Sequence, residues 1–257
     1  MLDISMAAHT ETGVRDENED SLRLGNEGWL RYAVLADGAG GHARGAEASR
    51  RVVDRVAQHL SDATFAAALL NDALLDAHAD LQQAQVGAQG ASRMHSTVVA
   101  LWLDTRHDQA LFSHIGDSRL YRLRYGRAEL LTADDSVVQR MLEGGAINAQ
   151  QALDHPMKNL LLAAAGMKEP VEPHTIAAPE PLEDGDAYLL CTDGWWGPLC
   201  SADMVDTLAA AVSPEHWLVL MSELIEARAT ASQDNYSAIA VWVSDPAEST
   251  QSMGEYI

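Results

Sequence analysis

The fold is most constrained at residues 30–41, LRYAVLADGAGG. Apart from Arg31, its first seven residues are apolar, and a run of this length and composition favours a buried β-strand. The run stops at Asp37-Gly38, a common turn dipeptide, and further glycines follow. We therefore expect Asp37 to lie at the end of a buried strand, where a charge that only aids solubility is not needed.

Other acids stand at the ends of strand-like runs elsewhere in the chain. The run at residues 187–192 also ends in Asp-Gly, at Asp193. Two further aspartates lie directly beside apolar runs, namely Asp117 and Asp234. Near the N-terminus, Glu19 and Asp20 follow Arg15. Each Asp-Gly pair taken alone is most simply a turn, so only the set as a whole points to a site.

Carboxylates at strand ends can meet at one edge of a folded sheet. Gathered carboxylates repel one another, and burial raises their pKa, unless a cation occupies the site. Hard oxygen ligands favour Mg²⁺ or Mn²⁺ over zinc. Two such ions about 3.5–4 Å apart activate water for attack on phosphorus. The acids therefore predict a two-metal hydrolytic site.

The rest of the chain predicts antiparallel sheets covered by helices. Strand-like runs lie at residues 96–103 and in a meander over 110–131, and helical periodicity appears at 46–60, 62–85, 204–212 and 215–228. Because the strands are grouped and the helices are separate from them, an α+β fold is favoured over a parallel α/β sheet. We expect a single domain over residues 1–244 and a polar C-terminal tail over 245–257.

Composition restricts the class of protein. The 257 residues carry a formal net charge of −21, which argues against nucleic acid or an anionic membrane as a partner. No apolar run is long enough to span a membrane, and the N-terminus lacks the pattern of a signal peptide. With two cysteines and no disulfide framework, we expect a cytoplasmic protein and no membrane insertion.

Motifs for other chemistries are missing. The glycines at 38–41 have neither a Walker lysine nor dinucleotide-binding spacing. There is no Gly-x-Ser-x-Gly elbow, and neither cysteine begins a Cys-x5-Arg phosphate loop. Covalent catalysis by serine or cysteine therefore has no support in the sequence.

In combination, the motifs resemble the type 2C family of metal-dependent protein serine/threonine phosphatases (PPM), in its compact bacterial form. The resemblance covers about residues 5–243. It is carried, in order, by Arg15-x3-Glu19-Asp20, Asp37-Gly38-x-Gly40-Gly41-His42, Ser96-Thr97-Val98, Gly116-Asp117-Ser118-Arg119, Thr192-Asp193-Gly194 and Asp234-Asn235-Tyr236-Ser237.

The resemblance implies a four-layer α-β-β-α sandwich, in which two antiparallel sheets are flanked by helix pairs. It also implies a set of site roles. Asp37 would bridge two Mn²⁺ or Mg²⁺ ions, with Glu19 and the Gly38 carbonyl on one side and Asp193 and Asp234 on the other. Asp117, with Asp193, would bind a third, weaker ion. Asp20 and Asn235 would support the site from a second layer, and Arg15 would bind the substrate phosphate. Ser96-Thr97 is expected to pack and hydrogen-bond rather than to take part in chemistry.

The implied reaction is direct hydrolysis of phosphoserine or phosphothreonine by a metal-bridging hydroxide, without a phosphoenzyme. Such an enzyme would act in signal transduction as a monomer on phosphoprotein substrates, opposing a bacterial serine/threonine kinase. The alternative is a catalytically weak relative that binds phosphoproteins as a regulator. A nuclease using two metals is disfavoured because no basic groove is evident.

Four departures from the family pattern bear on substrate choice and leaving-group chemistry. Ala39 leaves no histidine general acid after Asp37-Gly38. His95 stands where a small residue is usual, Asp134-Asp135-Ser136 replaces Asp-His-Ser, and the segment 159–166 lacks the usual Thr-Arg. The general acid for the leaving group is therefore not identified by the sequence.

Overall fold

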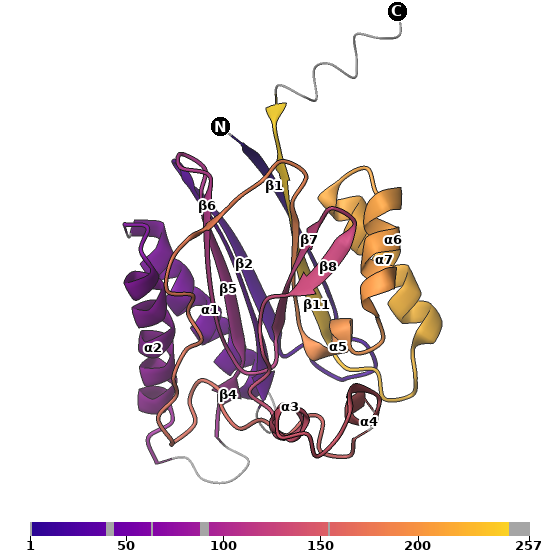
Figure 1. The fold of residues 1–257 in the computed structure, drawn as a ribbon. Helices are drawn as coiled ribbons and strands as arrows, with labels where there is room; N and C mark the ends of the chain where they lie inside the picture. Colours follow the sequence, from indigo (N-terminus) through magenta and orange to yellow (C-terminus); the bar gives the residue numbers. More distant parts are fainter. Residues whose placement is uncertain (1, 40–43, 63, 88–92, 154, 247–257) are drawn as a thin grey trace, which may run out of the picture.

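The computed structural model describes residues 2–39, 44–62, 64–87, 93–153 and 155–246. Figure 1 shows two β-sheets between two layers of helices. One sheet has the strand order β1-β11-β10-β7-β8, and every neighbouring pair in it is antiparallel. Its strands are β1 (Asp3–Glu11), β11 (Tyr236–Ser244), β10 (Ala187–Cys191), β7 (Arg119–Arg124) and β8 (Arg127–Leu130). The strand nearest the C-terminus thus lies inside the sheet, beside the strand nearest the N-terminus.

The second sheet has the order β2-β3-β5-β6-β9 and is also antiparallel. The two-residue strand β4 pairs with the end of β3, where Gly38 faces Ser96. The strands are β2 (Asp20–Glu27), β3 (Leu30–Ala39), β4 (His95–Ser96), β5 (Val98–Asp104), β6 (Gln109–Ile115) and β9 (Glu180–Pro181).

Two helix pairs cover the outer faces of the sheets (Figure 1). Helices α1 (Arg44–Asp62) and α2 (Ala67–Ala84) pack on the sheet that contains β3, and α6 (Ser201–Ala210) and α7 (Pro214–Arg228) pack on the other. Three short helices lie at one end of the sandwich: α3 (Val137–Glu143), α4 (Ala149–Leu153) and α5 (Asp193–Trp196). The predicted four-layer α+β sandwich is confirmed. Among the helices that the structure describes, none is long and apolar enough to cross a membrane.

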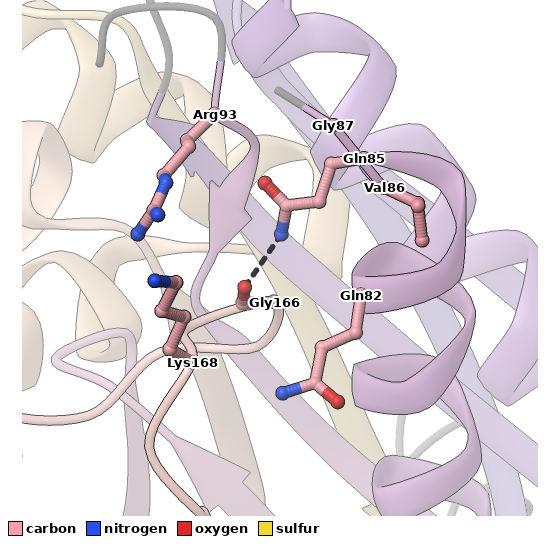
Figure 2. Close-up of a pocket in the computed structure, with 7 residues that line it drawn as sticks. All are labelled: Gln82, Gln85, Val86, Gly87, Arg93, Gly166 and Lys168. Carbon is pink, nitrogen blue, oxygen red and sulfur yellow. Dashed lines mark hydrogen bonds between the residues drawn. The ribbon is translucent and has the colours of Figure 1, made fainter. Parts of the chain in front are cut away.

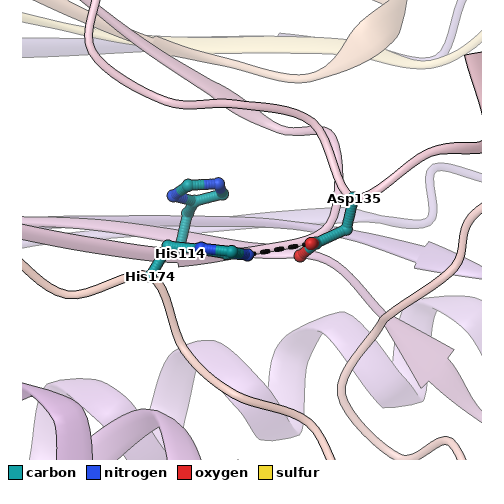
Figure 3. Close-up of side chains that lie close together, drawn as sticks. All are labelled: His114, Asp135 and His174. Atoms are coloured by element: carbon teal, nitrogen blue, oxygen red, sulfur yellow. Dashed lines mark hydrogen bonds and ion pairs between the residues drawn. The ribbon is translucent and has the colours of Figure 1, made fainter. Parts of the chain in front are cut away.

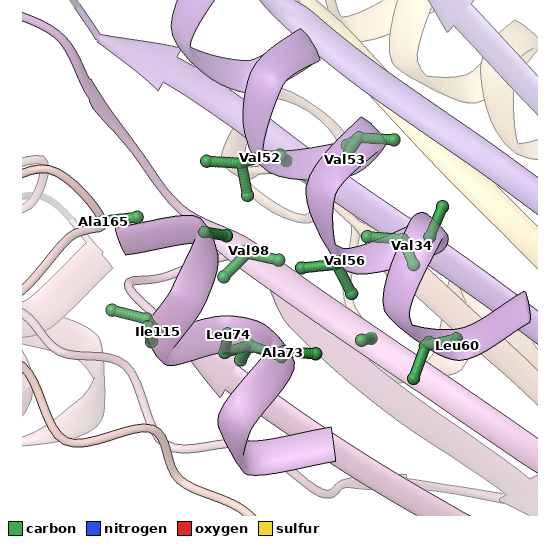
Figure 4. Packing of buried hydrophobic residues seen from close by; sticks show 14 of the residues in the cluster. Val34, Val52, Val53, Val56, Leu60, Ala73, Leu74, Val98, Ile115 and Ala165 are labelled. Carbon is green, nitrogen blue, oxygen red and sulfur yellow. The ribbon is translucent and has the colours of Figure 1, made fainter. Parts of the chain in front are cut away.

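Each interface between layers has its own apolar core. In Figure 4, Val52, Val56 and Leu60 project from α1 at the spacing of one helix face, toward β3 and β5. A second cluster lies between the sheets, and a third lies under α6 and α7 around Trp217. Full burial of each large apolar side chain contributes about 1.5–3 kcal/mol, so these cores fix the strands whose ends carry the acids.

Several element boundaries differ from the sequence expectations. Strand β2 was not expected, because only Leu22 and Leu24 among its residues are large and apolar and it lies at a sheet edge. Strand β3 continues past Asp37 to Ala39, and the strand expected at 96–103 is divided at Thr97. Asp193 begins a helical turn instead of a simple turn. Residues 40–43 and 247–257, which include Gly40, Gly41, His42 and most of the expected tail, lie outside the described residues.

Candidate active site

Two aspartates from adjacent strands lie opposite each other. Asp20 and Asp37 are register partners in the β2–β3 pair. Asp20 Oδ2 accepts a hydrogen bond of 3.1 Å from Thr192 Oγ1, whereas its buried Oδ1 has no partner among the described residues. Burial and the nearby Asp193 and Asp234 raise the pKa of Asp20 to about 7. Burial is the main cause that raises the pKa of Asp37 well above its usual value, and the negative charges of Asp20 and Asp193 raise it further.

Two more aspartates reach the same region, one after a strand of each sheet. Asp193 begins α5 after β10, and Asp117 follows β6 and is buried. Burial and Asp234 raise the pKa of Asp193 to about 6. Burial, and to a smaller extent the negative charge of Asp193, raises the pKa of Asp117 to about 8. The structure thus brings Asp20, Asp37, Asp117, Asp193 and Asp234 into one another's electrostatic field.

These residues fit a site for hard divalent cations. The pKa values rise because buried carboxylates face one another without a matching number of cationic side chains, and a divalent cation removes that penalty. The unpartnered Asp20 Oδ1 is a free acceptor within the group. All the side chains that could bind such an ion offer carboxylate oxygens, the ligand atoms that Mg²⁺ and Mn²⁺ prefer.

Glu19 joins the group through tight backbone packing. Its carbonyl accepts hydrogen bonds from Gly38 N at 3.1 Å and from Ser49 Oγ at 2.5 Å. Its carboxylate lies against the first turn of α1, where a Cβ on Gly45 would be 2.4 Å from Glu19 Cδ. Burial raises the pKa of Glu19, and Arg15 opposes that rise. Glycine at position 45 therefore leaves room for the carboxylate.

Arg15 forms an ion pair with a predicted metal ligand. Its Nη2 donates a hydrogen bond of 2.7 Å to Asp234 Oδ2, and the Arg15 side chain is 56% exposed. The other Asp234 oxygen accepts a hydrogen bond from Asn235 N at 2.9 Å. Arg15 is therefore held at the rim of the acidic group with donors open to solvent.

Asn235 ties the last strand to the N-terminal loop. Its Oδ1 accepts a hydrogen bond from Glu19 N at 2.9 Å, and its Nδ2 donates to the carbonyls of Thr12 and Glu17 at 2.8 and 2.9 Å. The side chain is buried, so each lost bond would leave an unsatisfied polar group. These contacts are consistent with the supporting position expected for Asn235.

Ser96 and Thr97 hold the backbone of Asp37. Asp37 N donates to Thr97 Oγ1 at 2.9 Å, and Ser96 Oγ donates to the Asp37 carbonyl at 3.0 Å. Thr97 Oγ1 also shares a hydrogen bond of 2.7 Å with Ser118 Oγ. These contacts are the packing and hydrogen bonding expected of this pair.

Trp196 is a site residue that the sequence did not reveal. Its Nε1 donates a hydrogen bond of 3.0 Å to the carbonyl of Asp117. The guanidinium of Arg119 lies 3.5 Å from the centre of a Trp196 ring and also binds both carboxylate oxygens of Asp134, at 2.9 and 2.8 Å. This stack fixes the backbone at Asp117. The only sequence signal was the aromatic pair that follows Asp193-Gly194.

A second cluster lies beside the Gly116 turn (Figure 3). His114, Asp135 and His174 each place one ligand atom within 4.8 Å of the others, a spacing that no three of the predicted carboxylates reach in the described part of the chain. The two imidazole rings stack at 21°, so their in-plane lone pairs do not converge on one point. Asp135 accepts hydrogen bonds of 2.9 Å from both Gly116 N and His174 Nε2. The cluster therefore anchors the turn before Asp117. His174 belongs to no motif in the sequence, so the sequence did not reveal its part in this cluster.

Comparison with known proteins identifies the family. Residues 8–232 match the family described as protein phosphatase 2C. The serine/threonine protein phosphatase PstP of Mycobacterium tuberculosis is 36% identical over 208 residues, which cover 79% of this chain and 38% of that protein. The catalytic domain of PstP, solved in complex with two manganese ions, superposes with a TM-score of 0.82 at 29% identity and covers 95% of this chain and 100% of that one.

PppA, described as a key regulatory component of the T6SS in Pseudomonas aeruginosa, superposes with a TM-score of 0.77 at 31% identity. That match covers 93% of this chain and 97% of PppA. Fold, acidic site and family match agree: the chain belongs to the protein phosphatase 2C family. The expected family resemblance is confirmed. The chain spans 38% of the length of the full mycobacterial PstP.

Proposed function

We propose that this chain is a protein serine/threonine phosphatase that requires Mn²⁺ or Mg²⁺. The observation that carries the proposal is the group of acids around Asp20 and Asp37, whose pKa values are raised by burial and by one another. Family membership and the manganese-containing PstP structure support the choice of reaction and metal.

The ligands that we propose for two ions are those expected from the sequence. Asp37 would contact both ions, Glu19 and the Gly38 carbonyl one of them, and Asp193 and Asp234 the other. Asp117 would hold a third, weaker ion together with Asp193. When bound, the ions supply positive charge for the phosphoryl oxygens and lower the pKa of water.

The remaining roles are to bind the substrate, to orient water and to hold the ligands in place. Arg15 offers a fork of donors that matches the oxygens of a phosphate. Asp20 Oδ1, the free acceptor, is suited to accept a hydrogen bond from water near Asp37 and so to orient it. Asn235 keeps Glu19 and the start of β11 in place.

The test is hydrolysis of p-nitrophenyl phosphate and of a phosphothreonine peptide, with and without Mn²⁺. We expect metal-dependent activity that Asp193→Asn abolishes. Asp54→Asn is the matched control, since Asp54 is an exposed partner of Arg23 on the protein surface. A folded protein that is inactive with every divalent metal would overturn the proposal and favour a phosphoprotein-binding role.

We also propose a monomeric, cytoplasmic enzyme with one catalytic domain over residues 1–244 that opposes a bacterial serine/threonine kinase. The net charge of −21 and the family support this assignment. Comparing the phosphoproteomes of cells with and without the gene tests the opposition to a kinase. An unchanged set of phosphorylated serines and threonines would contradict it.

A further inference from the structure

A cavity of about 250 Å³ lies outside the acidic site. It is lined by the end of α2, by Arg93 and by the turn at residues 166–168. Figure 2 shows the side chains of Arg93 and Lys168 pointing into the same space, across from Gln82 and Gln85. Among the described residues that line this cavity, none carries a carboxylate.

Two glutamines fix the segments that carry the cations. Gln85 Nε2 donates to the carbonyls of Gly166 at 2.5 Å and Met94 at 3.1 Å, and Gln85 Oε1 accepts from Met94 N at 2.9 Å. Gln82 Nε2 donates to the Met167 carbonyl at 2.7 Å. Both segments are therefore anchored to one helix, which keeps Arg93 and Lys168 on the same cavity.

The turn that presents Lys168 requires a glycine. Gly166 has a φ of +85°, and a Cβ there would lie 2.6 Å from the Met94 carbonyl oxygen. Its N–H donates a hydrogen bond of 3.1 Å to the buried His78 Nδ1. A side chain at position 166 would therefore push apart the two segments that bear the cations.

The charges of this pair are not neutralised within the protein. Most arginines of this acidic chain have carboxylate partners; examples are Arg51, Arg55, Arg119, Arg122, Arg124 and Arg228. Across the described residues, neither Arg93 nor Lys168 has an ion pair. Glu169 is the adjacent acid, and it is exposed and forms no ion pair with either cation. Two neighbouring cations without an ion-pair partner among the described residues favour a bound anion.

The cavity is connected to the acidic site through neighbouring strands. Ser96 pairs with Gly38 on one side and with Ala165 on the other. Arg93 and Lys168 each lie three residues from this pairing. With about 4.8 Å between paired segments and at most about 3.3 Å per residue along them, the backbones of Arg93 and Lys168 lie within roughly 15 Å of Gly38. An extended peptide covers that distance in about three or four residues.

We propose that Arg93 and Lys168 bind a second acidic group of the phosphopeptide substrate, a carboxylate or phosphate about three or four residues from the residue that is dephosphorylated. This inference rests on the proposed phosphatase function. The arginine supplies a planar fork of donors and the lysine a flexible point charge, and both match an oxyanion. The cavity would thereby determine which phosphorylated sequences are hydrolysed fastest.

The test uses a neutral phosphothreonine peptide and a series in which one aspartate or phosphoserine is moved outward on either side of the phosphothreonine. With wild-type protein and Mn²⁺, we expect kcat/KM to rise about 5- to 10-fold at one spacing, as for one charge-assisted contact open to solvent. The variant R93Q/K168Q should lose this preference, while its rates on the neutral peptide and on p-nitrophenyl phosphate stay unchanged. The variant R50Q/R106Q, in which two exposed arginines lose the same charge, should keep the preference.

The outcomes separate the two proposals. Hydrolysis of p-nitrophenyl phosphate without a preference for acidic peptides at any spacing overturns the inference and leaves the phosphatase function intact. A preference that persists in R93Q/K168Q overturns it as well. Absence of metal-dependent hydrolysis of every substrate overturns both proposals.

Discussion

Asp20 and Asp37 face each other across the β2–β3 pair as direct register partners. Directly opposed residues in an antiparallel pair have their Cβ atoms about 4.5–5.5 Å apart on the same face, and like charges at that distance destabilise the pair. The sheet accordingly holds together two acids that would separate if the chain could place them freely. A cation held by Asp37 would offset this repulsion.

Replacing one of these acids should stabilise the protein when chelator is present. We expect Asp37→Asn to raise the melting temperature in EDTA by about 2–4 °C for each 1 kcal/mol of relieved repulsion. The same variant should lose the increase in melting temperature that Mn²⁺ gives the wild type by binding the folded state. Thermal unfolding with EDTA and with Mn²⁺ measures both effects. A full Mn²⁺-induced increase in Asp37→Asn would contradict the ligand assignment.

The raised pKa values also predict a pH dependence of stability. Asp193, Asp20 and Asp117 titrate at about 6, about 7 and about 8 in the folded protein, above their values in the unfolded chain. The folded state therefore binds more protons than the unfolded state between about pH 4 and pH 8, and stability falls as pH rises through that window. Denaturant unfolding in EDTA should give a larger free energy of unfolding at the acidic end of this window. Replacing Asp20 and Asp117 by asparagine should flatten this slope, and an equally steep slope in that variant would exclude these groups as its cause.

The position of Arg15 predicts a specific loss of substrate binding. Arg15→Ala should lower kcat/KM on a phosphothreonine peptide by about 10- to 100-fold, as for one or two hydrogen bonds to a charged group. Arg15→Lys should recover only part of it, because lysine lacks the paired donors. Arg23→Ala is the matched control, since it breaks an exposed ion pair with Asp54 on the surface. Activity of Arg15→Ala within about twofold of wild type would leave Arg15 as a simple ion-pair partner of Asp234.

Trp196 should affect metal binding through Asp117. Trp196→Phe keeps an aromatic face for Arg119 but removes the N–H that bonds the Asp117 carbonyl. We expect a stability loss of about 1 kcal/mol and a higher Mn²⁺ concentration for half-maximal activity. Trp196→Ala should lose the stacking on Arg119 as well and should be less stable than Trp196→Phe. An unchanged Mn²⁺ requirement in both variants would show that the stack does not act on Asp117.

The sequence revealed the parts of the fold that rest on local pattern. The buried strands that end at Asp37 and Asp193 are visible as short apolar runs followed by Asp-Gly, and α1 is visible in the spacing of its valines. The antiparallel architecture followed from the grouping of these runs. The individual ligand roles of the acids and the phosphate role of Arg15 came from family resemblance and stay predictions until the variants above are measured.

The features that the sequence did not reveal depend on contacts between distant segments. Strand β2 has little apolar character of its own and is defined by pairing with β3. Trp196 acts on Asp117 across 79 positions, and Arg93 meets Lys168 only because Gln85 joins their segments. Neither contact leaves a local pattern, because each residue type at its own position is compatible with an ordinary surface or core role.

The place of β11 between β1 and β10 has a consequence for biosynthesis. Of the strands that the structure describes, β1 is made first, yet its sheet partner is β11, the last of them to be made. At about 5–20 residues per second, the ribosome needs roughly 10–50 seconds to make the chain between them. During that time β1 is an unpaired edge, open to wrong partners. Asp234, one of the ligands proposed above, is made just before this strand, so the proposed metal site is incomplete until synthesis has passed that point.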